Sequence, residues 1–394
     1  MKKPGICIIS EKQQILGIGG TETVSYLLKE ELKKNDYNVW STFFIQETEL
    51  EHNDLLLPDR EDYHSFKNKS FFINKIIENE IKIVLLQGEC DSFLMDICLE
   101  AKKATNIKLI CAYHFNPLMR IKAYDDYVEN LLNNSSSFIK PIYKLYFEIK
   151  RKSFRAKMQE IIKKEILKYD FENIDAFVSL NKNYTDFFKN ICPTSHKNKF
   201  YTIENPIILD KQEDFHNKEN VILFVGRLTF QKRLDRFLYV WQKIYKKNPL
   251  WSVVVVGDGN YANEYKKLTK NLQIKNISFV GQQPTEDYFK KSKVICMTSS
   301  YEGLPMVLIE AQKYGCVPIS YDSFDAATNI IKHGHNGVLI KPFRQNEYKK
   351  AINDIISNEE IRKQMALNGI KYIEKFNIKT IIQHWIELFN KLQY

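Results

Sequence analysis

The chain has 394 residues, of which 44% are hydrophobic and 27% are charged. This length exceeds one ordinary hydrophobic core and predicts two globular domains, while the absence of any long apolar run argues against membrane-spanning helices. The formal net charge of +10 points to an anionic partner, which is a sugar nucleotide, lipid headgroups or a nucleic acid.

The cysteines indicate the redox compartment. The sequence contains seven of them, none in a Cys-x-x-Cys pair, and Cys7, Cys111 and Cys296 lie inside apolar runs. We expect reduced core residues in a cytoplasmic protein.

Strand-like and helix-like segments alternate along the first part of the chain, which is typical of an α/β fold. The first strand, Gly5 to Ser10, leads into a loop that carries Gly17, Gly19 and Gly20, and a helix follows. This loop lacks the Gly-x-Gly-x-x-Gly spacing of a dinucleotide fold, so hydride transfer is disfavoured. Its amides are placed to meet a phosphate at a helix start. The alternative is an ordinary tight turn.

His114 ends a predicted strand that starts at Lys108. A histidine at the carboxyl end of a strand can donate a hydrogen bond to a sugar hydroxyl or to a departing phosphate. The alternative is a histidine that only caps a turn.

From Leu118 to about Asp170 the alternation of strand-like and helix-like segments breaks, and the pattern of residues 118–170 predicts a basic helical insertion. Its cations outnumber its acids and are interleaved with aromatic residues; they are Lys140, Lys144, Lys150, Arg151, Lys152, Arg155, Lys157, Lys163, Lys164 and Lys168. Such a helix can lie on an anionic membrane surface, here through residues 140–168. The alternative is a solvated helical hairpin whose aromatics pack onto the first domain.

A polar stretch from Glu204 to Asn220 predicts an interdomain hinge. We therefore assign residues 1–206 to an N-terminal Rossmann-like domain that holds the insertion, and residues 207–377 to a C-terminal one. The second domain begins with a buried strand, Val221 to Gly226, and a basic loop follows with Arg227 and Lys232. Cations fixed there would stabilise the charge that develops on a departing diphosphate, although such a loop alone is usually only solvated.

The segment from Ser299 to Gly315 carries the strongest signal. It follows an apolar strand and places Glu302 in a strand-to-helix loop and Glu310 on the helix, while Pro305 suits the first helical turn and Gly315 its end. Helical side chains lean toward the N-terminus, so Glu310 can reach toward Glu302. Two carboxylates beside a helix N-terminus suit a ligand with hydroxyls and phosphate. The alternative is a surface helix with an exposed Glu302.

The run Glu302-Gly-Leu-Pro-Met-Val-Leu-Ile-Glu310 closely resembles the signature of retaining glycosyltransferases of family 4, also called glycosyltransferase group 1. The resemblance implies the GT-B fold, with two Rossmann-like domains that face across a cleft and a C-terminal helix, about 378–394, that crosses back to the first domain. Arg227 and Lys232 match the Gly-Arg-x5-Lys-type loop of the family.

The resemblance also implies roles for single residues. Arg227 and Lys232 would hold the donor phosphates, Glu302 a hydroxyl of the transferred sugar, and Glu310 the ribose hydroxyls, with His114 near that sugar. The remaining donor-binding residues, implied by their places in the family's motifs, are Gly19, Gly20, Gly281, Gln282, Gly303, Leu304, Pro305, Met306 and Val307.

The implied reaction moves a hexose from a nucleoside diphosphate sugar, with UDP as the family's commonest nucleotide, to a glycan or lipid-linked acceptor in polysaccharide or glycolipid synthesis. No Asp-x-Asp occurs, so we expect no metal and no other cofactor. The implied mechanism keeps the anomeric configuration by front-face departure and attack. The implied location is cytoplasmic or peripheral at the inner face of the membrane.

Two other classes of function stay open. A sugar-nucleotide epimerase on the same fold would act on the donor without an acceptor. A non-catalytic protein that binds an anionic ligand or a membrane is permitted by the charge, but no signature of DNA or RNA recognition occurs, and we expect no nucleic acid partner.

Overall fold

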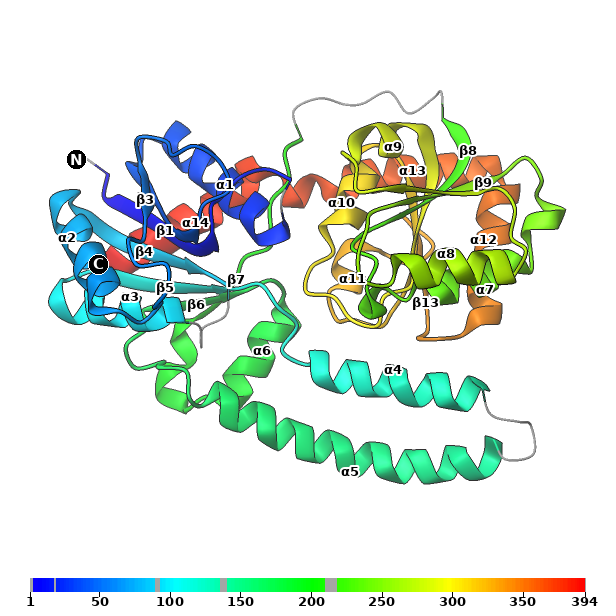
Figure 1. Cartoon of the computed structure of the whole chain (residues 1–394), viewed down its shortest axis with the longest axis horizontal. Helices are drawn as coiled ribbons and strands as arrows, with labels where there is room; N and C mark the ends of the chain where they lie inside the picture. The colour runs from blue at the N-terminus through cyan, green and yellow to red at the C-terminus, as the bar shows by residue number, and fades with distance from the viewer. Residues whose placement is uncertain (1–2, 18, 89–92, 135–139, 210–217, 394) are drawn as a thin grey trace. The chain divides into compact units, whose positions relative to one another are not determined.

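The computed structural model describes residues 3–17, 19–88, 93–134, 140–209 and 218–393. They form two units, each built around its own parallel sheet (Figure 1). The first unit comprises Met1–Phe115, Ile161–Ile208 and Lys375–Tyr394, and the second comprises Asn116–Glu160 and Leu209–Glu374.

The sheet of the first unit has the strand order β3-β2-β1-β4-β5-β6-β7. Its strands are β1 (Gly5–Lys12), β2 (Val39–Ile45), β3 (Asp54–Leu56), β4 (Ile81–Gln87), β5 (Lys108–Tyr113), β6 (Ala176–Ser179) and β7 (Phe200–Thr202). The central strands are apolar on both faces because helices cover both sides of a parallel sheet. The chain changes direction across the sheet between β1 and β4, so the topological switch point lies there.

The helices of the first unit are α1 (Gly20–Lys34), α2 (Phe66–Glu78), α3 (Phe93–Ala104), α6 (Lys182–Ile191) and α14 (Ile378–Gln393). The final helix, α14, buries Ile381, Trp385 and Phe389 against Leu28 of α1 and the sheet. The expected return of the C-terminal helix to the first domain is therefore confirmed.

The sheet of the second unit has the order β10-β9-β8-β11-β12-β13. Its strands are β8 (Glu219–Val225), β9 (Ser252–Val256), β10 (Ile277–Gly281), β11 (Ser292–Met297), β12 (Val317–Tyr321) and β13 (Val338–Ile340). Here the switch point lies between β8 and β11, and the loops after these two strands meet at one edge.

The helices around this second sheet are α7 (Leu234–Gln242), α8 (Ala262–Asn271), α9 (Glu286–Lys291), α10 (Met306–Lys313), α11 (Ala327–Ile330), α12 (Gln345–Ser357) and α13 (Glu359–Tyr372). Trp241 of α7 and Tyr348 of α12 are fully buried in the core on one face. The two-unit α/β architecture confirms the predicted fold class.

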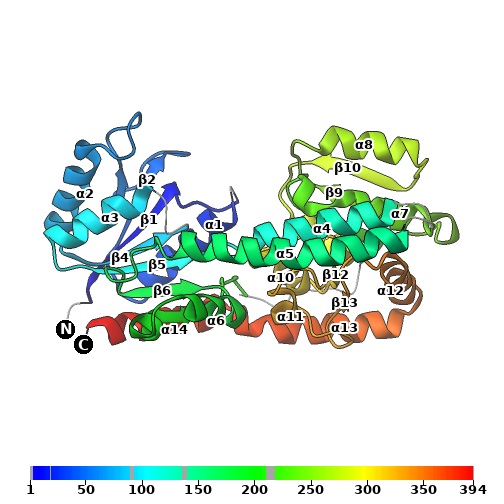
Figure 2. The same cartoon turned by 90° about the horizontal axis from the view of Figure 1, so that it is seen from below.

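The basic insertion forms an antiparallel pair of helices, α4 (Met119–Asn134) and α5 (Lys140–Ile166), which Figures 1 and 2 show side by side. The rings of Tyr124 and Phe154 stack with their centroids 3.6 Å apart. The Arg155 Nη2 atom lies 2.5 Å from Asp125 Oδ2. We call this pair the helical hairpin. Its Phe154 packs within the hairpin, not on the first domain as the alternative interpretation expected.

The hairpin docks on the second unit through a buried carboxylate. Asp126 of α4 is fully buried and forms ion pairs with Arg233 and Arg236 at the start of α7. The structure accordingly groups residues 116–160 with the second unit, whereas the sequence assigned the insertion to the first. The difference has a physical cause: burying Asp126 requires counter-charges, and α7 supplies both.

Five cysteines, Cys7, Cys98, Cys192, Cys296 and Cys316, are free and buried. Cys111 is disulfide-bonded, so the expectation of a reduced thiol is wrong at this position. Within the described ranges, no helix combines the length and apolar character that crossing a membrane requires.

Replacing Asp126 with Asn removes the charge while keeping the side chain's size. Because Arg236 would lose its buried counter-charge and Arg233 would keep Asp235 but lose Asp126, we expect a loss of about 3 kcal/mol in stability and a lower urea midpoint. The matched control is Asp186→Asn, which breaks an exposed pair with Lys182 and should cost under about 1 kcal/mol. Equal midpoints for the two variants would contradict the role of Asp126.

Candidate functional site

The site of the second unit is built from the two loops that follow β8 and β11. Hydrogen bonds join these loops: Ser300 N donates to Gln231 O at 2.8 Å, and Gln231 Nε2 donates to Tyr301 O at 2.8 Å. The Thr298 hydroxyl donates to Arg233 O at 2.7 Å. These contacts hold the two loops of the switch point as one structure.

Lys232 and Glu302, predicted separately from two motifs, lie together. Lys232 Nζ is 2.7 Å from Glu302 Oε1, and the two side chains are 17% and 9% exposed. Partial burial strengthens their attraction, because less water screens it. The pair places one cation and one carboxylate at the same point of the sheet edge.

Arg227 lies on the β8 loop with an exposed side chain. The glycine-rich turn after β9 packs against this loop. At Gly257, where φ is +129°, an added Cβ would lie 2.1 Å from the Gly226 carbonyl oxygen, so only glycine fits. Leu228 N also donates to Asp258 O at 2.8 Å. The turn therefore fixes the backbone on both sides of Arg227 and leaves its side chain in solvent.

Helix α10 begins at Met306, and Pro305 is its N-cap residue rather than its first helical residue. Gly303, Leu304 and Pro305 connect β11 to this helix, whose first turn holds Met306 and Val307. The free N–H groups of that turn and the helix dipole favour a negative charge. After the helix, Gly315 takes a φ of +70°, as the sequence predicted.

Glu310 lies on α10 with a half-buried side chain. Burial raises the pKa of its carboxyl group, and the nearby Lys313 ammonium offsets part of that rise. A partly desolvated carboxylate gains from hydrogen-bond donors, and the hydroxyls of a ligand can supply them.

Gly281 ends β10 with a φ of +74°, and its carbonyl accepts a hydrogen bond from Gly257 N at 2.7 Å. Gln282 follows with an exposed side chain. Both belong to the same edge of the second sheet as the glutamate loop, two strands from β8.

Gly19, Gly20 and His114 lie in the first unit, apart in sequence from the residues above. Gly19 is the N-cap of α1 in an extended conformation, and Gly20 begins that helix of 15 residues. An added Cβ at Gly20 would meet nothing within 4 Å. At Gly19, however, an added Cβ would lie 2.2 Å from Glu22 Oε2, so a carboxylate of this chain already lies beside the start of α1. A phosphate would have to displace it, and the phosphate role of Gly19 and Gly20 stays a prediction.

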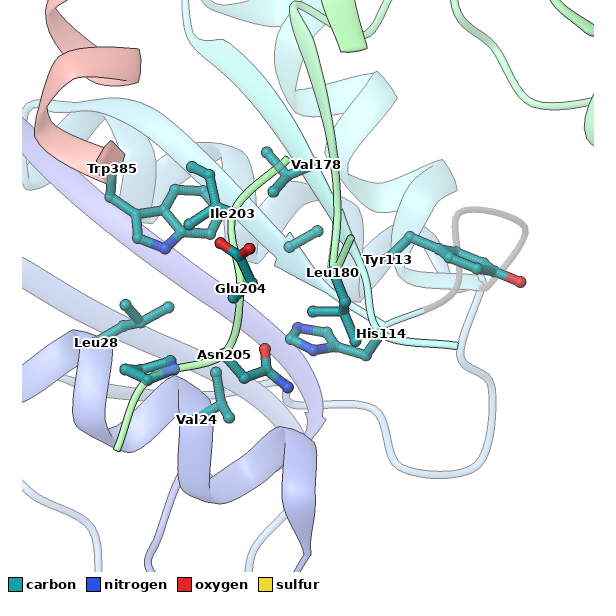
Figure 3. A pocket seen from close by; sticks show the side chains of 12 residues that line it. Val24, Leu28, Tyr113, His114, Val178, Leu180, Ile203, Glu204, Asn205 and Trp385 are labelled. Atoms are coloured by element: carbon teal, nitrogen blue, oxygen red, sulfur yellow. The ribbon is translucent and has the colours of Figure 1, made fainter. Parts of the chain in front are cut away.

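His114 directly follows β5, and its Nε2 atom contacts Gln87 Oε1. Burial lowers the pKa of its imidazole to about 4, against an opposing effect of Asn205. The ring borders a cavity of about 10 Å³, lined also by Glu204, Asn205 and Trp385 (Figure 3). That cavity holds at most one water molecule, so a sugar would have to meet His114 from another side.

The family comparison agrees with the geometry of the second unit. Residues 207–372 match the family model described as Glycosyl transferases group 1. This part of the chain is therefore similar to the glycosyl transferases group 1. The match contains Arg227, Lys232, Glu302 and Glu310, so the resemblance seen in the sequence is confirmed.

Curated relatives are similar over the same half of the chain. The amylovoran biosynthesis glycosyltransferase AmsD of Erwinia amylovora is 32% identical over 205 residues, which cover 51% of this chain and 54% of AmsD. An alpha-1,4-N-acetyl-D-galactosaminyltransferase of Campylobacter jejuni, named for an undecaprenol-linked glycan, is 30% identical over 178 residues, covering 45% of this chain and 49% of that enzyme. The chain thus spans about half the length of these relatives.

A solved structure matches the whole fold. HepE of Anabaena in complex with UDP and glucose has a TM-score of 0.72, at 13% identity, covering 99% of this chain and 100% of that chain. At this identity the likeness shows the fold alone, and it supports the GT-B assignment.

Two residues of this group 1 site were missed by the sequence analysis. Gln231 bridges the two loops, and Asn116 donates from Nδ2 to Glu302 O at 3.1 Å while its own Oδ1 accepts from Leu118 N. Asn116 is 2% exposed. A polar Asn-Pro pair directly after the His114 strand was the available signal, but no spacing rule connects it to a loop 186 residues away.

A metal site would require several metal-ligating side chains close together. Across the described part of the chain, His, Cys, Asp and Glu side chains do not gather in groups of three that could hold a metal ion. The expectation that the reaction needs no metal therefore stays a prediction.

The buried His114 ring generates a prediction about pH. Its folded-state pKa of about 4 lies below the ordinary value of 6.5, so the unfolded chain binds the extra proton. The contribution of the neutral His114 ring to the free energy of unfolding is fully present above about pH 6.5 and falls as the pH drops toward the folded-state pKa. We expect His114→Gln to flatten this decline, as measured by urea unfolding at a series of pH values. An unchanged pH dependence in the variant would show that the ring titrates as it does in water.

Proposed function

We propose that this chain is a retaining glycosyltransferase that moves a hexose from a nucleoside diphosphate sugar, with UDP as the nucleotide, to a glycan or lipid-linked acceptor. The observation that carries the proposal is the pairing of Lys232 with Glu302 beside the N-terminus of α10, at the switch point of a group 1 domain. There a cation, a carboxylate and helix N–H groups meet at the edge where α/β sheets bind ligands.

The cations Arg227 and Lys232 suit the diphosphate part of the donor. Its negative charge grows as the bond to the sugar breaks, and Arg227 and Lys232 would neutralise it, with Arg227 binding two oxygens at once. The N-terminus of α10 adds N–H donors. When Lys232 turns to phosphate, the Glu302 carboxylate would accept a hydroxyl hydrogen of the sugar in its place.

The proposed step breaks the bond between the anomeric carbon and the diphosphate oxygen, and a bond to the acceptor oxygen forms on the same face. The acceptor's proton passes to the departing phosphate, so no protein nucleophile and no metal is required. Glu310 would accept hydrogen bonds from the ribose hydroxyls, since its raised pKa reports an incompletely solvated carboxyl group. His114 would contact the transferred sugar only if its ring released Gln87.

The relatives support the acceptor class. AmsD is named for amylovoran biosynthesis, and the Campylobacter enzyme is named for an undecaprenol-linked glycan. HepE is described with UDP and glucose. By extension, we propose that this chain acts in the synthesis of a cell-surface polysaccharide or glycolipid.

Contact of the hairpin with an anionic membrane is part of this proposal. Arg151 and Arg155 are paired with carboxylates of α4, so the exposed Lys150 and Lys152 would provide the attraction instead. Flotation with anionic liposomes tests this, and equal retention of a Lys150→Glu, Lys152→Glu double variant would remove the idea.

We expect Arg227→Ala and Lys232→Ala each to lose transfer by a factor of roughly 100 or more, because each removes charge stabilisation from the transition state. The assay supplies labelled UDP-hexoses with and without glycan acceptors, and it scores transfer, isomerised donor and free hexose separately. The matched control is Arg344→Ala, which removes an exposed cation of the same unit. Turnover within a few-fold of wild type in both site variants would contradict the assignment, and isomerised donor without transfer would indicate an epimerase.

Glu310→Gln should weaken donor binding more than it slows the chemical step. The amide keeps the size of the side chain but loses a charged acceptor, and a hydrogen bond to a charged group contributes about 1.5–3 kcal/mol. We expect a KM for the donor raised by tenfold or more, with kcat changed less, in steady-state kinetics. The Glu347→Gln variant, on the exposed face of α12, is the control. A variant with normal KM and low kcat would assign Glu310 to the chemistry instead.

A further inference from the structure

A cavity of the second unit lies between the helical hairpin and the carboxyl edge of the sheet. Its volume is about 180 Å³, and none of Arg227, Lys232, Glu302 and Glu310 lines it. One wall comes from α4 and α5, and the other comes from the loops after β11, β12 and β13. The cavity is thus a separate space from the donor site proposed above.

The charges of the hairpin wall are already paired: Lys122 Nζ lies 3.5 Å from Asp325 Oδ1 of the second unit, and the other charges pair within the hairpin. Arg151 Nη2 lies 3.0 Å from Glu129 Oε1, and Arg151 Nε lies 3.3 Å from Asp125 Oδ1. Arg155 also forms an ion pair with Asp125. A free anion would have to compete with these carboxylates, whereas a hydroxyl can accept from a guanidinium and donate to a carboxylate at once. This wall therefore suits a neutral ligand with several hydroxyls.

The opposite wall holds a buried polar group without a partner. Ser300 is 2% exposed, and its Oγ makes no hydrogen bond within the described residues, although it lines the cavity. A buried hydroxyl without a hydrogen bond costs free energy, so a ligand that supplies one is favoured.

Phe343 gives the cavity an apolar surface. This residue has a φ of +68°, which is rare for a bulky side chain and is kept only when the surroundings impose it. The Arg236 guanidinium lies 3.7 Å from the centroid of its ring. An aromatic ring among paired charges and hydroxyls can pack against the C–H face of a sugar ring.

We propose that this cavity binds one sugar residue of the acceptor glycan, and this inference rests on the proposed glycosyl transfer. The volume is below that of pockets for drug-sized ligands, which start at about 300 Å³, and it suits a single ring. Ser300 stands two residues before Glu302, and Asn116, at the base of the hairpin, binds the Glu302 carbonyl. The acceptor residue would thus rest on the loop that holds the donor.

The test measures binding of simple sugars to the whole chain by saturation-transfer difference NMR. The probes are the methyl glycosides of glucose, galactose, N-acetylglucosamine and N-acetylgalactosamine, with inorganic phosphate as a competitor. We expect at least one glycoside to bind, and Ser300→Ala and Arg155→Ala each to weaken it by up to roughly tenfold, as one lost hydrogen bond does. The controls are Ser357→Ala on α12 and Lys157→Ala on the exposed side of α5.

A thermal-shift assay with UDP, run on the same proteins, separates the two proposals. A UDP response with no glycoside binding, or with binding that survives in both cavity variants, overturns the acceptor site and leaves the transferase proposal intact. Competition by phosphate that depends on Arg155 also overturns it, because the cavity would then be an anion site. Glycoside binding that the cavity variants weaken, in a chain that UDP does not stabilise, would support the sugar site and contradict the transferase.

Discussion

The buried Asp126 carboxylate and its partners Arg233 and Arg236 form the interaction on which the second unit depends. It attaches the hairpin to the start of α7, where Arg233 has a left-handed backbone conformation with a φ of 50°. Arg233 directly follows Lys232, so this ion cluster also fixes the chain beside the donor site. A buried ion group of this kind is sensitive to the loss of any one partner, because the remaining charges stay desolvated.

The same ion cluster contacts residues of both proposed sites, which are far apart in the sequence. On one side of Arg233, Lys232 pairs with Glu302 at the switch point of the sheet. On the other side, Arg236 packs on Phe343, which lines the cavity against the hairpin. The proposed donor and acceptor sites therefore share one rigid frame, in which the β11 loop contributes Glu302 to the first and Ser300 to the second.

Much of this architecture could be predicted from local pattern. The apolar runs of the strands, the glycine at position 315 and the α10 helix follow from periodicity and turn chemistry, which act within a few residues. The motifs likewise placed Lys232 and Glu302 in strand-to-helix loops at the carboxyl edge of the sheet. What the pattern did not show was their direct pairing or the bridge through Gln231, since both depend on atoms of two separate loops. Nor did it show that Cys111 is disulfide-bonded.

The hairpin shows most clearly what could not be predicted from the sequence alone. From the amino-acid sequence alone, residues 118–170 could be recognised as helical, basic and aromatic, and the two Rossmann-like halves could be identified. Tertiary structure alone decided that Asp126 turns inward, that Phe154 packs on Tyr124, and that the hairpin joins the second unit. The physical reason is that the residues around Asp126 in the sequence carry no sign of its partners, because the energy of its buried charge is set by neighbours more than 100 residues away.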